Sequence, residues 1–236
     1  MLEYVLKTAE GAGIKKIVVV VGFKGEMVVD FLAGRAEPVW QEKMMGTGDA
    51  VAKAEGALSG FKGNILVLYG DVPLLTTETV KRLIREHEES SAACTLVSVC
   101  LQDPTGYGRI LRGEDGEVRG IVEETDAAPE EKKLKEINAG VYCFSSEYLF
   151  PCLRLVKPDN RKGEYYLTDV IDILVRQGRR VKSMIIEDAG EVMGINTPEE
   201  LLEAEKILLG RKKGDDIHIV SLRGLRQSSV ADDAAI

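Results

Sequence analysis

Unbroken runs of apolar, β-branched residues, alternating with segments of helical periodicity, constrain the fold of this chain most. Residues 17–22 are IVVVVG and residues 64–71 are NILVLYGD. Such runs are typical of parallel strands that are covered on both faces. The segments around them, such as 2–12 and 77–87, carry apolar residues at the spacing of one helical face. This alternation predicts an α/β fold with three layers and a mostly parallel sheet.

The second half of the chain predicts an antiparallel extension of that sheet. Strand-like segments follow one another with little helix between them, and Asp115-Gly116 lies at the centre of a predicted hairpin turn. The predicted strands here are CTLVSVCL, the two arms of GRILRGEDGEVRGIVEE, EINAGVYCFSS, VKSMIIE and the short segment VMGI. Further helices are predicted at about 146–155, 164–177 and 198–209.

Composition excludes several classes of function. A chain of 236 residues with 44% hydrophobic residues suffices for one sizeable core. Its formal net charge of -8 argues against binding to nucleic acid or a membrane surface. The 4 cysteines form no CxxC pair, which favours reduced thiols, and no signal peptide or membrane-spanning run is visible. We therefore expect a cytoplasmic protein.

Asp71 is the first candidate for chemistry, because it ends an apolar strand. Ligands of open α/β sheets bind at the carboxyl ends of the strands. One interpretation is a turn aspartate, since Val72 and Pro73 follow at once. The other is a ligand of Mg²⁺ that faces phosphate oxygens.

Two glycine-containing segments are further candidates. Gly46-Thr47-Gly48 opens a predicted helix, where unpaired N–H groups suit an anion or a nucleobase carbonyl. Residues 103–110 are DPTGYGRI, in which glycines flank a tyrosine before a strand, so Gly108 is expected to lie close to another group. A tight turn into the hairpin is the alternative for this second segment.

Three polar residues lie beside or within apolar segments. Glu123 follows the apolar GIV, and Asn138 lies inside an apolar strand, where its amide needs a partner. Asn196 ends the segment VMGI, and it is either a site residue or a turn residue before the next helix.

The order of several motifs resembles that of one family. The motifs are YGDVPL, DPTGYGRI, GIVEETDA, EINAGVY, GEYYLTD and EVMGINTPEEL. From Met1 to about Leu209 the chain resembles the pyrophosphorylase domain of the bifunctional N-acetylglucosamine-1-phosphate uridyltransferase (GlmU) family. The resemblance implies a Rossmann-like, GT-A-like three-layer fold. It also implies a reaction of UTP with N-acetylglucosamine 1-phosphate that gives UDP-N-acetylglucosamine and pyrophosphate.

The resemblance also implies roles for individual residues. Asp71 and Asn196 would hold the catalytic Mg²⁺. Gly46, Thr47, Gly48 and Tyr69 would bind the nucleotide, with Tyr69 beside the ribose. The sugar would be bound by Gly108, Glu123, Asn138, Tyr166 and Thr168. The sugar phosphate would attack the α-phosphorus of UTP in line, so positioning and charge neutralisation supply the catalysis.

The sequence departs from the family at both ends. The family's glycine-rich signature, LAAGxGTRM…PK, is absent, and Met1 aligns just after it. We expect the first strand to be missing, a gap in the sheet, low stability and little activity of this chain. No hexapeptide repeat of the family's acetyltransferase β-helix follows Leu209, so the oligomeric state stays open. The predicted organisation is a nucleotidyltransferase domain over 1–209 and a poorly ordered tail over 210–236, with IHIV as a possible edge strand.

Three positions keep alternatives open. Met44 stands where the family has a glutamine that contacts uracil, Ala139 where a threonine is common, and Thr125 where a lysine is common. The first hypothesis is a UTP-dependent enzyme that makes UDP-N-acetylglucosamine. The second is a related nucleotidyltransferase for another sugar or nucleotide. The third is a non-catalytic, truncated remnant.

Overall fold

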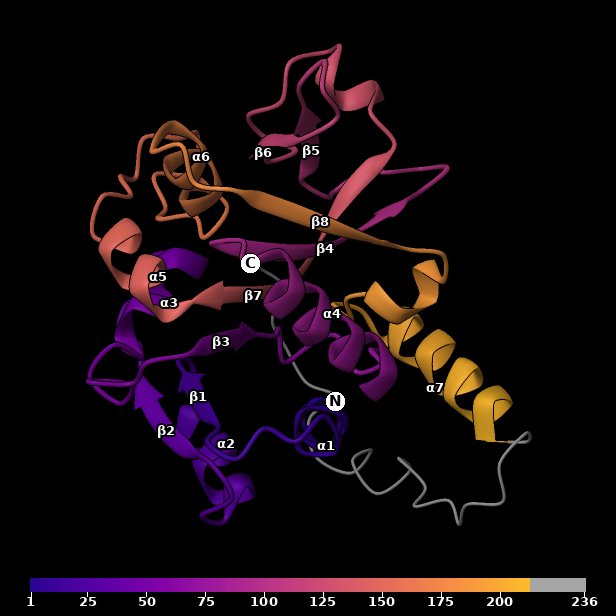
Figure 1. Cartoon of the computed structure of the whole chain (residues 1–236). Helices are drawn as coiled ribbons and strands as arrows, with labels where there is room; N and C mark the ends of the chain where they lie inside the picture. The colour runs from indigo at the N-terminus through magenta and orange to yellow at the C-terminus, as the bar shows by residue number, and fades with distance from the viewer. Residues whose placement is uncertain (213–236) are drawn as a thin grey trace.

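The computed structural model describes residues 1–212 as a mixed α/β fold (Figure 1). Its α-helices are α1 Leu2–Gly11, α2 Gly25–Leu32, α3 Thr47–Lys53, α4 Thr77–Ser90, α5 Ser146–Leu153, α6 Asp169–Arg176 and α7 Pro198–Lys212. Its strands are β1 Val18–Val21, β2 Glu37–Trp40, β3 Asn64–Val67, β4 Cys94–Cys100, β5 Arg109–Arg112, β6 Val118–Val122, β7 Glu136–Ser145 and β8 Val181–Ile186. Two short 3-10 helices are η1 Glu131–Lys133 and η2 Ala189–Val192.

A six-stranded mixed sheet forms the centre of the fold. Along the path β6-β5-β7-β4-β8, β7 runs antiparallel to β5 and β4, whereas β4 and β8 are parallel. β3 also pairs antiparallel with β7. Strands β3, β4, β5 and β8 therefore run in one direction, and β7 is inserted between them in the other. The predicted α/β fold with an antiparallel hairpin extension is confirmed.

Helices cover both faces of this sheet, as the three-layer prediction requires. On one face, Val80 and Leu83 of α4 pack in a buried cluster with Val97 of β4. On the other, Ile171 of α6 packs in a second cluster with Leu96 of β4. Successive residues of β4 thus point to opposite layers, because side chains alternate along a strand.

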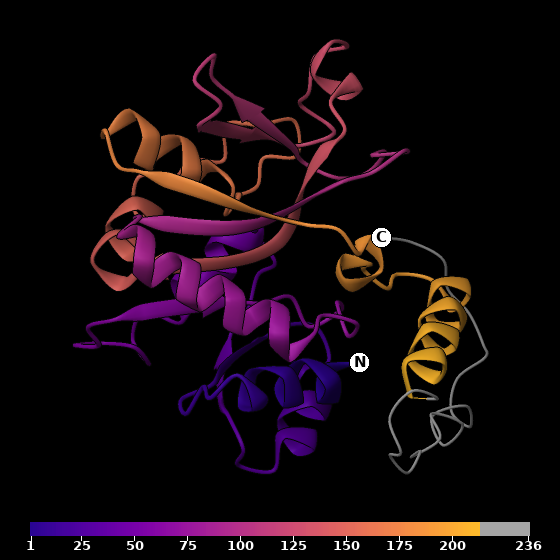
Figure 2. The ribbon, with the colours of Figure 1, turned by 45° about the vertical axis from the view of Figure 1, so that its right-hand side comes forward.

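Strands β1 and β2 form a separate two-stranded parallel sheet. Figures 1 and 2 show this pair on the side of β3 away from β7. Among residues 1–212, β1 pairs with no strand but β2, and β3 with none but β7. The sheet is therefore interrupted between β1 and β3, in agreement with the predicted gap.

Several predicted boundaries are wrong. The segment VMGI is not a strand. Ala189–Val192 is a 3-10 helix, and the Ile195 N–H donates to the Asp71 carbonyl rather than to a neighbouring strand of a sheet. The helix predicted from Glu164 begins at Asp169, because backbone bonds hold the preceding residues against another loop. α7 continues past Leu209 to Lys212, and the predictions for the tail from 213 onward lie outside the described residues.

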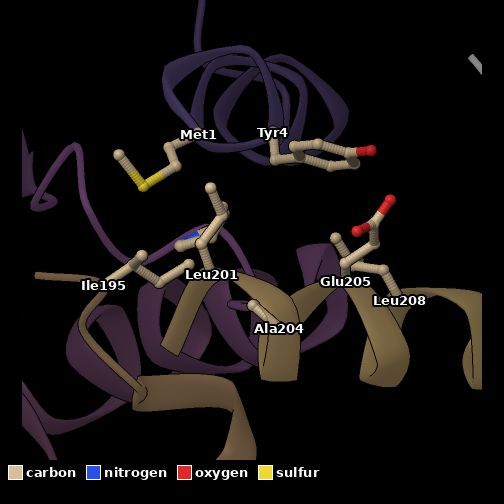
Figure 3. Close-up of a pocket in the computed structure, with 8 residues that line it drawn as sticks. Met1, Tyr4, Ile195, Leu201, Ala204, Glu205 and Leu208 are labelled. Carbon is tan, nitrogen blue, oxygen red and sulfur yellow. The ribbon is translucent and has the colours of Figure 1, made fainter. Parts of the chain in front are cut away.

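α7 packs beside α1 and leaves a small pocket between them (Figure 3). Met1 and Tyr4 line it from the α1 side, and Leu201, Ala204 and Leu208 from α7. The space open to the centre of a water molecule is about 10 Å³, which is roughly enough for one water. This pocket is too small to hold a nucleotide.

Candidate active site

The structure brings Asp71 and Asn196 together, although they are 125 positions apart in the sequence. The backbone N–H of Ile195 donates to the carbonyl of Asp71 over 3.0 Å. A Cβ placed on Gly194 would lie 3.7 Å from Asn196 Nδ2 and 3.9 Å from Asp71 Oδ2. The carboxylate and the amide therefore both lie within 4 Å of one point in the turn that follows β3. β3 ends at Val67, so Asp71 lies in this turn and not at the end of the strand as predicted.

The N-terminus of α7 fixes the backbone on which Asn196 lies. Glu200 accepts hydrogen bonds from the backbone N–H groups of Asn196 and Thr197, at 2.6 and 2.9 Å. The Thr197 hydroxyl in turn accepts from Glu200 N–H, which completes a capping box. These contacts lower the pKa of Glu200, chiefly through the two backbone N–H groups. Asn196 itself is exposed, so its side chain is open to a ligand.

The Gly46-Thr47-Gly48 loop packs against the segment before α6. Gly48 N–H donates to the Tyr165 carbonyl over 2.7 Å, and the Thr47 hydroxyl accepts from Leu167 N–H. A Cβ on Gly46, whose φ is 107°, would lie 2.5 Å from the Tyr165 carbonyl oxygen. Glycine is required here because the loop approaches its own chain closely, and not only to make room for a ligand.

Tyr69 connects this loop with the central strand β7. Its ring lies against Gly140, where a Cβ would be 2.8 Å from Tyr69 Cε2. Burial raises the pKa of Tyr69 to about 12, and the nearby Glu123 carboxylate adds to the rise. Hydrogen bonds with the hydroxyls of Thr47 and Tyr142 act in the opposite direction. Tyr69 is therefore a neutral phenol at neutral pH, held between predicted nucleotide and sugar residues.

The predicted sugar residues of the hairpin and of the segment before α6 also meet. The Thr168 hydroxyl donates to Glu123 Oε1 over 2.8 Å, and a Cβ on Gly108 would lie 3.3 Å from Glu123 Oε2. Burial raises the pKa of Glu123, while the Thr168 hydrogen bond lowers it. Tyr166 is buried beside Gly48, and burial raises the pKa of its phenol.

Asn138 joins this group through β7. Its backbone N–H donates to the Gly108 carbonyl over 2.9 Å, and its side-chain amide donates to the Tyr142 hydroxyl over 2.6 Å. The partner that an amide inside an apolar strand needs is thus a tyrosine four residues later on the same strand.

Two further residues lie next to the candidate site residues, and sequence reasoning did not assign them a role. Arg109 is 1% exposed, and its guanidinium bonds Glu124, the Tyr107 carbonyl and the Lys132 carbonyl, so it anchors the hairpin base. Gln41 is buried, and its amide donates to the Gly46 carbonyl and to Asp49. Arg109 could have been noticed in the sequence because it directly follows Gly108, a predicted site residue. Met44, at the position expected to contact uracil, is 67% exposed.

The residues at the start of α6 add negative charge near Glu123. Burial raises the pKa of Asp169 to about 6, and the carboxylates of Asp172, Glu123 and Asp126 reinforce the shift. Among residues 1–212, no three His, Cys, Asp or Glu side chains form a cluster that could hold a metal ion. A metal here would therefore take further ligands from water, amide oxygens or a substrate.

A comparison with family models decides the assignment of the fold. The model described as "Nucleotidyl transferase" matches residues 1–208. The chain belongs to the nucleotidyl transferase family. This result confirms the resemblance drawn from the sequence motifs.

Curated relatives and a solved structure support the same assignment. The chain is 42% identical over 211 residues to the bifunctional protein GlmU of Acetivibrio thermocellus, and 45% identical over 211 residues to that of Lactobacillus johnsonii. Each alignment covers 89% of this chain and 46% of the relative, so the chain spans about half the length of these relatives.

The likeness to a solved structure concerns the fold. A crystal structure of UDP-glucose pyrophosphorylase complexed with UDP-glucose superposes with a TM-score of 0.70 at 19% identity. The superposition covers 89% of this chain and 86% of that one. In the part of the chain that the structure describes, no helix combines the length and apolar character needed to cross a membrane.

Proposed function

We propose that this chain carries a sugar-1-phosphate nucleotidyltransferase site, with UTP and N-acetylglucosamine 1-phosphate as substrates and UDP-N-acetylglucosamine and pyrophosphate as products. The observation that carries the proposal is the convergence of Asp71 and Asn196 around Gly194, next to Tyr69. Membership of the nucleotidyl transferase family and similarity to GlmU proteins support it. The cytoplasm stays our expectation for the compartment.

Mg²⁺ is the cofactor that suits the pair Asp71 and Asn196. Carboxylate and amide oxygens are hard donors, and Mg²⁺ typically takes one or two protein oxygens together with substrate phosphates. When bound, the ion would neutralise charge on the phosphates. The two side chains would hold it beside the turn after β3, and water or phosphate oxygens would complete its coordination.

The nucleotide and the sugar would lie on either side of Tyr69. Gly46, Thr47 and Gly48 would contact the nucleoside. The buried amide of Gln41 supports their loop by donating to the Gly46 carbonyl. Gly108, Glu123, Asn138, Tyr166 and Thr168 would surround the sugar. Tyr69, neutral and held on Gly140, would separate the two parts without introducing charge.

A related specificity is the second candidate, and Met44 favours it. The thioether at this exposed position cannot donate a hydrogen bond to a base. A nucleotide panel separates the candidates: UDP-, TDP- and ADP-linked sugars are titrated into the 236-residue chain with MgCl₂ by calorimetry. The first candidate predicts tightest binding of UDP-N-acetylglucosamine, and tighter binding of another base would contradict it.

The metal assignment is tested in the same assay. We expect Asp71→Asn to lose the Mg²⁺-dependent part of UDP-N-acetylglucosamine binding, whereas the exposed control Glu130→Gln keeps it. Binding is measured first, because this chain is expected to have little catalytic activity even where it binds its ligands. Pyrophosphate release from UTP and the sugar phosphate then tests turnover. Unchanged metal dependence in Asp71→Asn would contradict the assignment.

A further inference from the structure

A bulge in β7 brings Asn138 and Tyr142 into contact. Ser98 of β4 pairs with Asn138, and Leu96 pairs with Tyr142. Three residues of β7, Ala139 to Val141, therefore face the single residue Val97. Gly140 lies at the centre of the bulge with φ 71°.

The bulge changes which side chains can meet. In a regular strand, residues four apart are separated by roughly 13 Å, which no asparagine side chain spans. Here Asn138 Nδ2 lies 2.6 Å from the Tyr142 hydroxyl. Bulges next to active sites often redirect a side chain in this way.

The ring of Tyr142 is held rigidly. The residue is fully buried on the face of the sheet that packs against α5 and α6. Its ring stacks on Phe144, with centroids 5.5 Å apart and an interplanar angle of 25°. Because the ring cannot move without disturbing this core, its hydroxyl is a fixed reference point for Asn138.

Both ends of the Asn138 amide are then assigned. Nδ2 can only donate, so the Tyr142 oxygen accepts from it. Oδ1 accepts from the backbone N–H of Gly140 over 3.2 Å. Within residues 1–212, one N–H of Nδ2 and one lone pair of Oδ1 have no hydrogen-bond partner, which lets Asn138 donate to one group of a ligand and accept from another.

We propose that Tyr142 is a positioning residue, whose hydroxyl fixes the amide of Asn138 in the orientation that binds the sugar of a nucleotide sugar. The role in sugar binding rests on the proposed function. The claim that Tyr142 fixes the Asn138 amide does not depend on it. The Tyr142 hydroxyl also lies near the hydroxyl of Tyr69, which brings the predicted sugar residue Asn138 close to the nucleotide side.

The first test needs no ligand. In the wild-type 236-residue chain, the Asn138 amide proton that bonds to the Tyr142 hydroxyl is expected to exchange slowly with solvent in NMR spectra. Tyr142→Phe keeps the ring and its stacking but removes the hydroxyl, so this protection is expected to be lost. Tyr148→Phe, on α5 beside Arg179, is the matched control and leaves it unchanged. Fast exchange in the wild type, or unchanged protection in Tyr142→Phe, would overturn the proposal.

The second test separates positioning from general stability. Tyr142→Phe is expected to weaken binding of UDP-N-acetylglucosamine about tenfold, because Asn138 loses a fixed partner, and to leave UDP binding within about twofold. Equal weakening of both ligands, or no weakening, would overturn the sugar role. If the wild type binds neither ligand, the proposed function fails, while the NMR experiment still decides whether Tyr142 fixes Asn138.

Discussion

Strands β1 and β4 come from similar sequences but lie in different surroundings. Both are rich in β-branched and apolar residues, VVVV in β1 and CTLVSVC in β4. In β4 every residue but the last is buried, between β7, β8 and helices on both faces. In β1 only Val21 is buried, and Val18 to Val20 stay partly exposed.

The difference shows that an apolar run predicts a strand better than it predicts burial. β4 has strand neighbours on both edges, whereas β1 pairs only with β2 among residues 1–212. An isolated two-stranded sheet is marginally stable, because it buries little apolar surface. The β1–β2 pair, with α1 and α2, should therefore be the weaker part of the molecule.

The largest expected effect contrasts the two strands directly. Leu96→Ala in β4 removes a fully buried side chain and should lower the free energy of unfolding by about 2–5 kcal/mol. Val19→Ala in β1 removes a partly exposed one and should cost much less. Urea unfolding followed by circular dichroism measures both.

The same titration can follow β2 alone, because Trp40 is the single tryptophan of the chain. Its fluorescence should change at lower urea than the circular dichroism signal, since the β1–β2 pair opens first. The two regions would not differ in stability if the fluorescence and circular dichroism transitions coincided and both variants lost the same free energy of unfolding. A cooperative melt above about 60 °C would also contradict the predicted low stability.

A smaller effect is expected at the bulge, where the large sheet meets the site. Gly140 and Gly178 have nearly equal φ angles, 71° and 69°, but only Gly140 has a neighbour at its Cβ position, Tyr69. Alanine in this conformation costs about 1–2 kcal/mol at either position. Gly140→Ala should lose more stability than Gly178→Ala and should also weaken nucleotide-sugar binding. Equal losses of stability for the two variants in calorimetric melts would show that the Tyr69 ring moves aside without an energetic penalty.

The charge near α6 gives a pH-dependent prediction for the large sheet. The pKa of Asp169 is raised from 3.8 to about 6, so the folded state binds its proton more tightly than the unfolded state does. This contribution to stability is present below about pH 3.8 and is lost as pH rises through about 6. Asp169→Asn should therefore stabilise the protein at pH 7.5 relative to wild type, and much less at pH 4. Thermal melts at both pH values measure this, and an equal gain at both would contradict the shift.

The smallest effect is expected at the surface of the weaker region. Arg35 pairs with Glu3 of α1 over 2.6 Å, and both side chains are about one third exposed. Exposed ion pairs add little stability, because water and salt screen them. Arg35→Ala should leave the urea midpoint of Trp40 fluorescence unchanged. A clear shift would mean that this pair, rather than apolar packing, holds α1 in place.

Sequence reasoning named most of the residues that the structure brings together, but few of their contacts. Asp71 and Asn196 were predicted together from separate motifs, and the structure brings them together beside Gly194. Their role as metal ligands stays a prediction. Tyr142 was missed, because an apolar-looking tyrosine inside a strand gives no signal of a polar contact. Its partner Asn138 comes within reach only through the bulge, which the spacing of residues does not reveal.

The sequence by itself determined the order and type of most elements, the hairpin at Asp115-Gly116 and the polar residues that follow or interrupt the apolar strands. Local periodicity and turn chemistry carry this information, because they act between neighbours along the chain. Tertiary structure decided how deeply β1 is buried, where β7 bulges and which backbone each glycine meets. Gly46 meets Tyr165 and Gly140 meets Tyr69 across more than 70 residues, so these contacts exist only once the layers have packed.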